Sequence, residues 1–324
     1  MTEGAKQAPL PLLPPEPYTP AMTLRGNRHF APDRRALLAG VGTVLIAGSA
    51  RGAPAQDPAT ATRAVIAALR PLAMRAVVLE QANRPTVCPL GGSPRLPAST
   101  AWPDRKGRPL SFIAELDLAA LRAVGGPDWL PASGFLHLFF DTGEEPWGFD
   151  PADHDGWKIL LTDGVAAGTH PHPPGLSRDQ VFQPVLLAGR SALTYPTTER
   201  LTLSPEVGRA FDFETVQAFM DADLGDGPRH QVGGFPSPIQ SDGMELEAQL
   251  ASNGIYMGGP DSYSDERIAA LEPGAADWRL LLQIDSDDAA GIMWGDTGTL
   301  YVWVREQDAR MGDFSRVWMI VQSS

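Results

Sequence analysis

The sequence predicts a β-dominated α+β fold, in which an internally duplicated antiparallel β unit carries a few short helices. Short runs of β-branched and aromatic residues alternate with segments rich in Gly, Pro and Asp, as is typical of antiparallel sheets. Stretches with helical spacing are fewer and shorter. Three motifs also recur in the same order in the two halves of the chain, which favours a duplication.

The expected elements follow one another from residue 58 onward. A helix is predicted over residues 58–74, with threonine available for its cap, and a strand over residues 75–81. Further strands are predicted at residues 110–116, 134–140, 157–162, 280–284, 299–304 and 316–321. Further helices are predicted at residues 116–124, 211–223 and 241–253.

The duplication is predicted from paired strands, glycines and turns. "PLSFIAELD" (109–117) resembles "DWRLLLQID" (277–285), and each ends in an apolar residue followed by aspartate. Downstream of each, a glycine enters a strand with leucine two residues on. Upstream, "GGSP" (91–94) is echoed by "GGFP" (233–236), where glycine permits backbone angles closed to other residues and proline fixes the exit. We therefore expect two halves that pack across a shared sheet or interface.

Composition narrows the function classes. The chain has 324 residues with 43% hydrophobic content, enough for a substantial core. Its formal net charge is -13, from 39 acidic and 26 basic residues. Nucleic acids and anionic membrane surfaces select basic patches, so neither is expected as a partner.

The N-terminal 55 residues have the order of an export signal. Arg34 and Arg35 precede an apolar stretch at residues 36–50, which is shorter than a membrane span needs. Small residues on both sides of Pro54 suggest cleavage after Ala55. The paired arginines predict the twin-arginine route, and the alternative is a short buried helix behind two solvated arginines.

Export would leave residues 56–324 as a single domain made of two weakly similar halves. The long segment before the arginines is unusual for a signal, so we expect translation to start at Met22. The expected location is periplasmic or secreted, and the alternative is cytoplasmic. Cys88 is the one cysteine, so no intrachain disulfide can form, and it is interpreted as a buried structural residue.

Several separated motifs resemble the YwqG-like proteins, a bacterial domain family of unknown function. They are "GGSPRLPASTAWP", "PLSFIAELDL", "HQVGGFPSPIQSD", "WRLLLQIDSD", "MWGDTGTLYVWV" and "VWMIVQ", and they cover roughly residues 88–322. One departure is Glu115, where the family strand carries glutamine. The resemblance implies a mainly β fold with an internal duplication and no established activity. Family members are commonly cytoplasmic, so an exported member would be atypical.

Carboxylates after the strand at residues 280–284 form the first candidate site. Asp285, Asp287 and Asp288 supply hard oxygen ligands of the kind that calcium or magnesium binds, and Asp296 follows nearby in sequence. The spacing is not that of an EF-hand, because the glycine and the bidentate glutamate of that loop are absent. The alternative is that Asp285 accepts backbone N–H bonds in a turn while its neighbours face solvent.

A second set of candidates combines two amides and an indole. Gln283 lies in an apolar strand and needs a hydrogen-bond partner if buried, for which Gln240 is proposed. Asp242 could line a pocket beside Gln240, or could cap the following helix. Trp294 lies in a loop between strands, where it would form the wall of a polar cleft with Asp285 and Asp296.

These observations predict a non-enzymatic binding or interaction protein with an acidic surface and an aromatic-lined cleft. Its partner would be a protein or a small polar ligand, and no cofactor is expected, although a divalent cation is possible. The alternative is a divalent-metal-dependent hydrolase that uses the Asp285 cluster to polarise water. We favour binding because no nucleophile elbow, phosphate loop or Rossmann glycine pattern is present. The sequence does not indicate the oligomeric state.

Overall fold

The computed structural model describes residues 57–82, 87–166 and 168–324, all of which belong to one compact unit. The expected export signal at residues 1–55, with its arginines and cleavage site, lies outside the described residues. Among the residues that are described, no helix has the length and apolar character that a membrane crossing requires.

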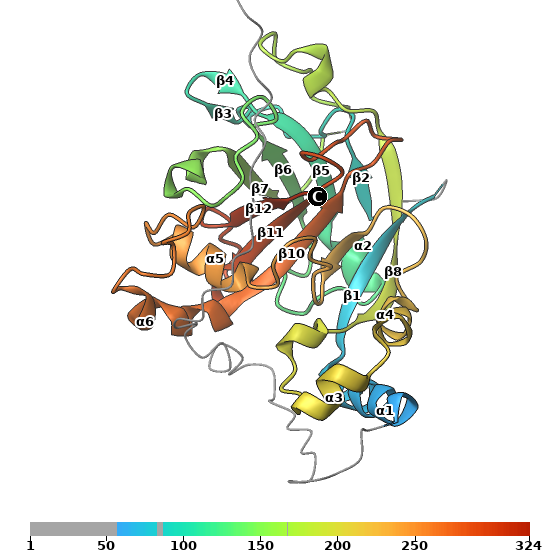
Figure 1. The fold of residues 1–324 in the computed structure, drawn as a ribbon. Helices are drawn as coiled ribbons and strands as arrows, with labels where there is room; N and C mark the ends of the chain where they lie inside the picture. The colour runs from blue at the N-terminus through green and yellow to red at the C-terminus, as the bar shows by residue number, and fades with distance from the viewer. Residues whose placement is uncertain (1–56, 83–86, 167) are drawn as a thin grey trace, which may run out of the picture. The chain divides into compact units, whose positions relative to one another are not determined.

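One antiparallel sheet of ten strands forms the centre of this unit (Figure 1). Its strand order is β12-β11-β10-β9-β1-β8-β2-β5-β6-β7. The strands are β1 (Met74–Gln81), β2 (Cys88–Leu90), β5 (Ser111–Asp117), β6 (Phe135–Phe140), β7 (Trp157–Thr162), β8 (Val185–Thr194), β9 (His230–Gly233), β10 (Trp278–Asp285), β11 (Thr299–Arg305) and β12 (Trp318–Gln322). A separate hairpin joins β3 (Asp104–Arg105) to β4 (Arg108–Pro109). The predicted β-dominated α+β class is confirmed.

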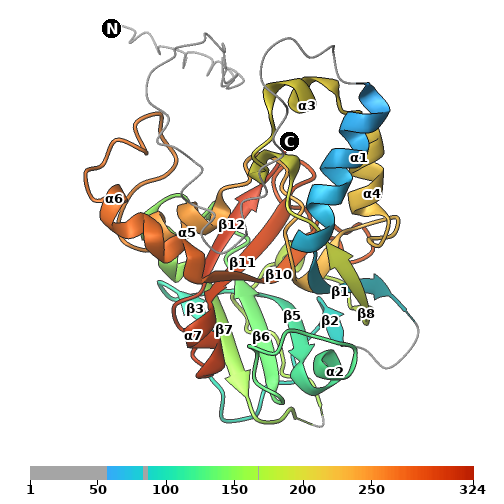
Figure 2. The ribbon, with the colours of Figure 1, turned by 90° about the horizontal axis from the view of Figure 1, so that it is seen from below.

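The helices are short and lie outside the sheet (Figure 2). They are α1 (Pro58–Leu69), α2 (Leu118–Ala123), α3 (Pro205–Ala210), α4 (Phe213–Asp221), α5 (Met244–Ala251), α6 (Ile268–Leu271) and α7 (Glu306–Arg310). Short 3-10 turns are η1 (Arg70–Leu72), η2 (Pro151–Asp155), η3 (Arg178–Gln180), η4 (Thr198–Arg200) and η5 (Glu272–Asp277). Helix α1 packs on α3 and α4 through a small apolar cluster that includes Val65, Val207 and Val216. Its cap is Asp57 rather than a threonine, because the Asp57 carboxylate accepts the Thr60 N–H.

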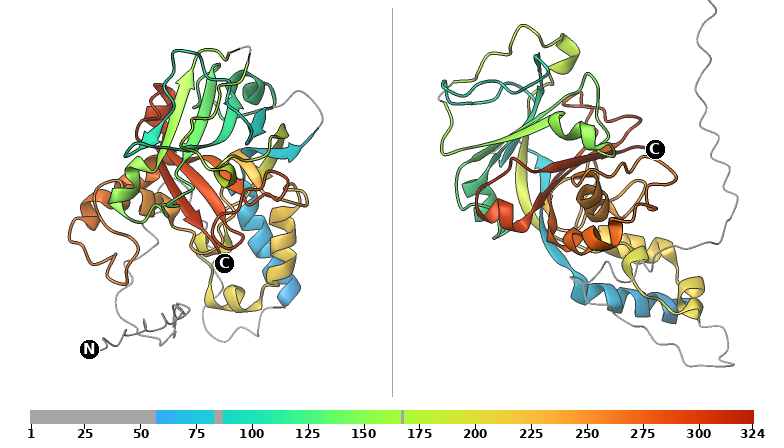
Figure 3. Two further views of the ribbon diagram at one scale, coloured as in Figure 1. Left: turned by 90° about the horizontal axis from the view of Figure 1, so that it is seen from above. Right: turned by 90° about the vertical axis from the view of Figure 1, so that its left-hand side faces the viewer.

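The two edge strands of the sheet approach one another, so the sheet nearly closes into a barrel (Figure 3). The Trp157 indole of β7 donates to the Val317 carbonyl at 3.1 Å and meets the Trp318 ring edge-on, with centroids 5.2 Å apart. Trp318 is the first residue of β12, and its indole donates to the Gly148 carbonyl at 2.8 Å. A β-carbon at Gly148 would lie 1.8 Å from the Met319 carbonyl oxygen, so only glycine allows this approach.

Strand β8 is the principal element that the sequence did not predict. It spans ten residues and pairs with both β1 and β2, so it joins the two halves of the sheet. The apolar pattern of β8 is interrupted by Gly189, Arg190 and Ser191. A search for alternating apolar and polar residues therefore does not detect this strand. Arg190 is accommodated by an exposed ion pair with Glu80 of β1, with N and O atoms 2.6 Å apart.

Cys88 begins β2 in the core, with 1% of its surface exposed. Burial, reinforced by the negative charge of Glu115, raises the pKa of its thiol to about 12. Because the thiolate is the reactive species, we expect no reaction with an aromatic disulfide reagent at pH 8 in the folded protein. One thiol per chain should appear after addition of urea, and rapid labelling without denaturant would contradict the structural role.

Candidate functional site

The structure places Asp285 in a turn, where both oxygens of its carboxylate accept hydrogen bonds. Oδ2 accepts the Arg229 backbone N–H at 3.0 Å, while Oδ1 accepts the Ser286 N–H at 3.0 Å and the Thr299 hydroxyl at 2.8 Å. These contacts tie the end of β10 to the start of β9 and to β11. Asp285 therefore fits the alternative turn interpretation, in which its oxygens satisfy backbone donors.

Asp287 and Asp288 point to different environments. The buried Asp287 carboxylate lies 3.0 Å from His230 Nε2, and its other oxygen accepts the Ala290 N–H at 3.0 Å. The hydrogen bond from His230 lowers the pKa of Asp287. His230 Nδ1 accepts the Asp285 N–H at 3.1 Å, which leaves Nε2 as the ring nitrogen that donates to Asp287. Asp288 is exposed.

The expected three-carboxylate metal site is therefore not assembled. Each of the three carboxylates has a different neighbourhood, because the chain turns sharply between them. Throughout the described part of the chain, no three His, Cys, Asp or Glu side chains gather in an arrangement that could hold a metal ion.

Trp294 does not form the wall of an open cleft, which corrects the sequence interpretation. Only 1% of its surface is exposed, and its ring packs edge-on against Phe140 with centroids 5.3 Å apart. Its backbone N–H donates to the Ser286 hydroxyl at 3.0 Å, and its carbonyl accepts the Gly298 N–H at 2.7 Å. These bonds fold the loop back on itself and direct the indole into the core, while Asp296 stays exposed.

The two amides also do not pair with each other. Gln283 accepts the Ser237 N–H at 3.0 Å and donates to the Arg229 carbonyl at 2.9 Å. Both the oxygen and the nitrogen of its amide are therefore hydrogen-bonded to backbone groups. Gln240 is exposed and donates to the Ser323 carbonyl at 2.7 Å. Asp242 does not cap α5 and instead forms an ion pair with Arg200.

A row of buried polar side chains binds the segment after the GGFP turn. Gln283, Tyr301 and Gln322 lie on neighbouring strands β10, β11 and β12, with Gln283 directly opposite Tyr301. Tyr301 donates to the Ser237 carbonyl at 2.7 Å, and Gln322 accepts two backbone N–H groups and donates to one carbonyl within residues 239–241. The row fixes residues 237–241 on the sheet.

The first half carries polar side chains at the matching positions. Glu115 of β5 lies opposite His137 of β6, and His137 Nε2 lies 3.0 Å from the Thr162 hydroxyl of β7. Glu115 accepts the backbone N–H of Arg95, the residue directly after the GGSP turn, at 3.3 Å. In the same way, Gln283 accepts the backbone N–H of Ser237, the residue directly after the GGFP turn. The carboxylate also binds the Arg95 guanidinium, with Nε at 2.9 Å. Glutamate therefore keeps the backbone contact and adds an ion pair.

Backbone details of the two halves also agree. Both β5 and β10 contain a bulge, between Phe112 and Ala114 and between Leu280 and Leu282. Both turns hold their two glycines in the left-handed region, where φ is +68° and +70° at Gly91 and Gly92 and +70° and +75° at Gly233 and Gly234. Only glycine adopts such angles without strain, so these turns need glycine at both positions.

Glu115 gives the fold an acid-sensitive contact. Burial alone would raise its pKa, but hydrogen bonds from His137 and Arg95 and their charges outweigh burial and lower the pKa below the ordinary 4.5. A depressed folded-state pKa stabilises the fold above the ordinary value, and that stability is lost as pH falls through the folded-state pKa. Glu115→Gln should therefore flatten the loss of stability below about pH 4.5, measured by urea unfolding from pH 3 to 7. Parallel curves for both proteins would contradict this assignment.

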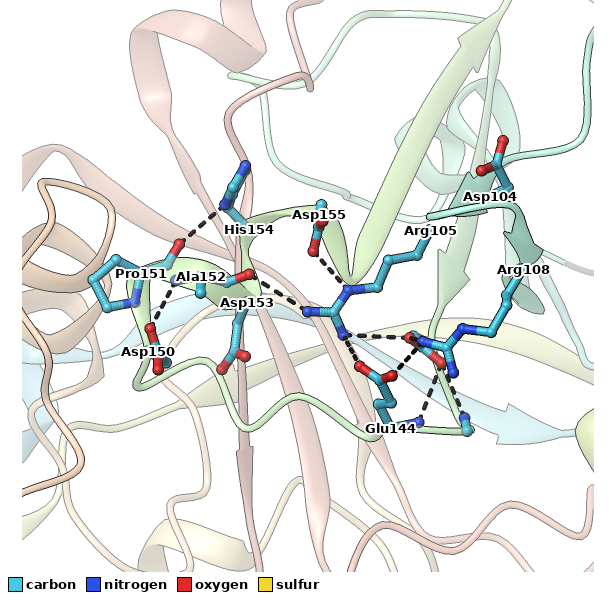
Figure 4. Close-up of polar contacts among 12 residues, drawn as sticks. Asp104, Arg105, Arg108, Glu144, Asp150, Pro151, Ala152, Asp153, His154 and Asp155 are labelled. Atoms are coloured by element: carbon cyan, nitrogen blue, oxygen red, sulfur yellow. Dashed lines mark hydrogen bonds and ion pairs between the residues drawn. The ribbon is translucent and has the colours of Figure 1, made fainter.

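A network around a buried guanidinium lies at the far end of β6 (Figure 4). Arg105 is 5% exposed, and its Nε donates to Asp155 at 2.6 Å. Its Nη1 donates to Asp141 at 3.3 Å and to Glu144 at 3.1 Å, and its Nη2 to the Ala152 carbonyl at 3.4 Å. Burial alone would lower the pKa of Arg105, but bonds to Asp155 and Asp141 raise it, so the guanidinium stays charged.

The β3–β4 hairpin brings a second guanidinium to the same carboxylate. Lys106 and Gly107 both have positive φ, at 52° and 79°, which makes a tight turn and sets Arg105 opposite Arg108. Arg108 Nη2 donates to Asp141 Oδ2 at 3.1 Å and contacts Glu144 at 2.6 Å. The Arg108 side chain is 48% exposed, so one face of its guanidinium reaches solvent.

Asp141 organises the turn after β6. Its Oδ1 accepts the backbone N–H groups of Gly143 and Glu144 at 3.1 and 3.2 Å. Its Oδ2 accepts hydrogen bonds from the guanidinium groups of Arg105 and Arg108. The carboxylate is 5% exposed and both of its oxygens are engaged. Asp141 is therefore a fixed anchor for the two guanidinium groups rather than a free acceptor.

A pocket of about 340 Å³ opens beside this network. Its walls come from three segments far apart in the sequence. The lining residues are Arg108, Pro109, Asp141, Thr142, Gly143, Gly175, Ser177, Asp179 and Gln180. The volume lies near the lower end of the range for small-molecule sites.

Two hydrogen-bond donors converge above Gly143. A β-carbon at Gly143 would lie 3.1 Å from Gln180 Nε2, 3.4 Å from Asp141 Oδ1 and 4.0 Å from Arg108 Nη1. Gln180 Oε1 accepts the Ser177 N–H at 3.2 Å and its hydroxyl at 2.9 Å, which fixes the amide so that Nε2 faces Gly143. No partner within the described residues takes the hydrogens of Nη1 or of this Nε2.

The sequence contains weak local signals for two of the segments that form this pocket. "SRDQ" (177–180) fits the capping-box pattern, and the structure holds the reciprocal bonds of such a box. "DRKGRP" (104–109) has the charged turn of a hairpin. Neither signal indicates that the two segments meet, because that depends on long-range packing.

Comparison with known families assigns the chain to a class and then to a family. The fold and site define a β-dominated domain with a small polar pocket. The chain belongs to the family described as "Domain of unknown function (DUF1963)", whose model matches residues 89–323. A search of curated proteins finds no match.

Proposed function

We propose that the protein is a non-enzymatic binding protein whose pocket takes a small polar ligand through a carbonyl or carboxylate oxygen. The observation that carries this proposal is the convergence of Arg108 Nη1 and Gln180 Nε2 above Gly143. A guanidinium and an amide can both donate to one oxygen or to the two oxygens of a carboxylate.

The chemistry of the lining supports binding over turnover. Arg108 offers a guanidinium, which donates hydrogen bonds and has no acceptor atom, so it is not a general base. Both oxygens of Asp141 already accept hydrogen bonds from the protein, so its carboxylate is engaged in holding the two arginines and the turn. Of the polar side chains that remain, Ser177 and Gln180 bond each other, Thr142 bonds Ser111, and Asp179 is an exposed carboxylate. Arg108 and Gln180 therefore position a ligand oxygen without activating it.

Removal of the Arg108 guanidinium should weaken ligand binding strongly. Arg108→Gln deletes a charge-assisted bond, so the affinity found by titration against small carboxylates and amides should fall about tenfold or more. Arg209→Gln on α3 makes the same charge change at an exposed position outside the pocket and should bind as the parent does. Equal affinities for the two variants would overturn the proposal.

A second variant blocks the pocket without altering its charge. Gly143 does not need the left-handed region, so alanine is tolerated there once the end of the flexible Gln180 side chain shifts by a few tenths of an ångström, and its methyl group then occupies the space beside the two donors. Gly143→Ala should lose binding while unfolding at nearly the parent temperature. Gly164→Ala, where a β-carbon meets nothing within 4 Å, is the matched control and should retain binding.

We also infer that residues 1–55 form a cleaved twin-arginine signal, so that the protein works outside the cytoplasm. The paired Arg34 and Arg35, the short apolar stretch and the small residues at the cleavage site support this. N-terminal sequencing of protein from the periplasm should begin at Gln56. Recovery of the intact N-terminus from the cytoplasm alone would contradict export.

Finally, we infer that the domain arose by duplication of one β unit and belongs to the YwqG-like group. The matched bulges, the left-handed glycine pairs and the two polar rows support a duplication. In this interpretation, the row on β10–β12 kept the neutral amides that bind residues 237–241. The row on β5–β7 acquired the Glu115–Arg95 ion pair.

A further inference from the structure

We propose that the ligand carries an ammonium group in addition to its carbonyl or carboxylate oxygen, so that its class is a small amino acid or amino amide. This inference rests on the proposed function of the pocket and adds the chemical class of the ligand. It follows from the charges that surround the pocket, from the position of Asp179 in its lining and from the volume available.

The two guanidinium groups are already neutralised by carboxylates of the protein. Arg105 pairs with Asp141, Glu144 and Asp155, and Arg108 pairs with Asp141 and Glu144. Three carboxylates therefore face two guanidinium groups. A ligand whose only charge is negative meets no excess positive charge here, and a dianion such as phosphate is repelled more strongly than a monoanion.

Asp179 adds a further negative charge on the pocket wall. Its side chain is exposed and lines the pocket together with Gln180, which follows it in the chain. No arginine, lysine or histidine within the described residues forms an ion pair with Asp179, so the charge is open to a cation from solvent. A ligand ammonium group that reaches Asp179 would complement it while the ligand oxygen binds Arg108 and Gln180.

The volume limits the size of this ligand. About 340 Å³ accommodates an amino acid or a short amino amide, whereas nucleotides and long peptides need more space or would extend outside the pocket. Donors on one part of the wall and a carboxylate on another match the two ends of a zwitterion. The spacing between the ammonium and the ligand oxygen is then the property that the pocket selects.

Titration with two matched ligand series tests the inference. The first series is glycine, β-alanine, 4-aminobutyrate and 5-aminopentanoate, and the second is the corresponding carboxylates without the amino group. At least one amino acid should bind the full chain about threefold more tightly than its partner carboxylate, the ratio that an exposed ion pair supports. Asp179→Asn should bring that ratio close to one, and Asp163→Asn, an exposed acid outside the pocket, should leave it unchanged.

The outcomes separate the two proposals. Binding of both series with equal affinity, lost in Arg108→Gln, would overturn the ammonium inference and keep the pocket as a carbonyl or carboxylate site. A preference for amino acids that persists in Asp179→Asn would also overturn the inference. Absence of any Arg108-dependent binding in both series would instead contradict the proposed function itself.

Discussion

Arg105→Met should destabilise the fold by about 3 kcal/mol, since it leaves the buried Asp141 with one guanidinium in place of two. Methionine fills a similar volume, so the loss comes mainly from the carboxylate rather than from packing. Asp155 and Glu144 also lose their partner, but their side chains are 37% and 52% exposed and contribute less. The measurement is the free energy of unfolding in urea at pH 7.

The matched control is Arg310→Met, because Arg310 forms an exposed ion pair with Glu306 on α7. An exposed pair of this kind contributes about 0–1 kcal/mol, so the control should differ little from the parent. A double variant, Arg105→Met with Asp141→Asn, should recover part of the loss because the stranded charge is gone. If Arg105→Met costs no more than Arg310→Met, the buried network does not support this end of the sheet.

Gln283→Leu should cost about 3 kcal/mol, because it leaves the Ser237 N–H and the Arg229 carbonyl without their partner at a buried position. The segment at residues 237–241 would then be held on the sheet by fewer contacts, chiefly those of Tyr301 and Gln322, so faster amide hydrogen exchange is expected there as well. Unfolding in urea and hydrogen exchange of the folded protein measure the two effects.

Gln240→Leu provides the comparison for this prediction. The same chemical change is made at an exposed amide that donates to one carbonyl, so its effect should stay within about 0.5 kcal/mol. Similar losses for Gln283→Leu and Gln240→Leu would show that the buried row contributes no more than a surface contact. Unchanged exchange at residues 237–241 would lead to the same conclusion.

Much of the fold could be predicted because most of its strands have a recognisable local sequence pattern. The runs that became β5, β6, β7, β10, β11 and β12 combine apolar and β-branched residues between turns, which is a local signal. Strand β8 lacked that signal, since Arg190 is stabilised by Glu80 of a strand more than one hundred residues away. Such long-range compensation cannot be read from a local pattern.

The candidate site was harder to predict for the same reason. Asp285, Trp294 and Gln283 were chosen because they are unusual in their local context, and each was placed by contacts with distant backbone or core atoms. The pocket depends on the meeting of residues 108–109, 141–143 and 175–180. Each of these segments resembles an ordinary polar turn, and only the packed sheet brings their donors together.

The most direct test of the pocket observes the Arg108 guanidinium during ligand titration. Its ¹⁵N–¹H signal can be assigned by its loss in Arg108→Gln and followed while 4-aminobutyrate or β-alanine is added. The proposal predicts a saturable shift of the Arg108 signal, with the Arg209 signal unchanged and the shift absent in Gly143→Ala. An Arg108 signal that stays in place as ligand is added, or that moves equally with Arg209, would contradict a binding site at this pocket.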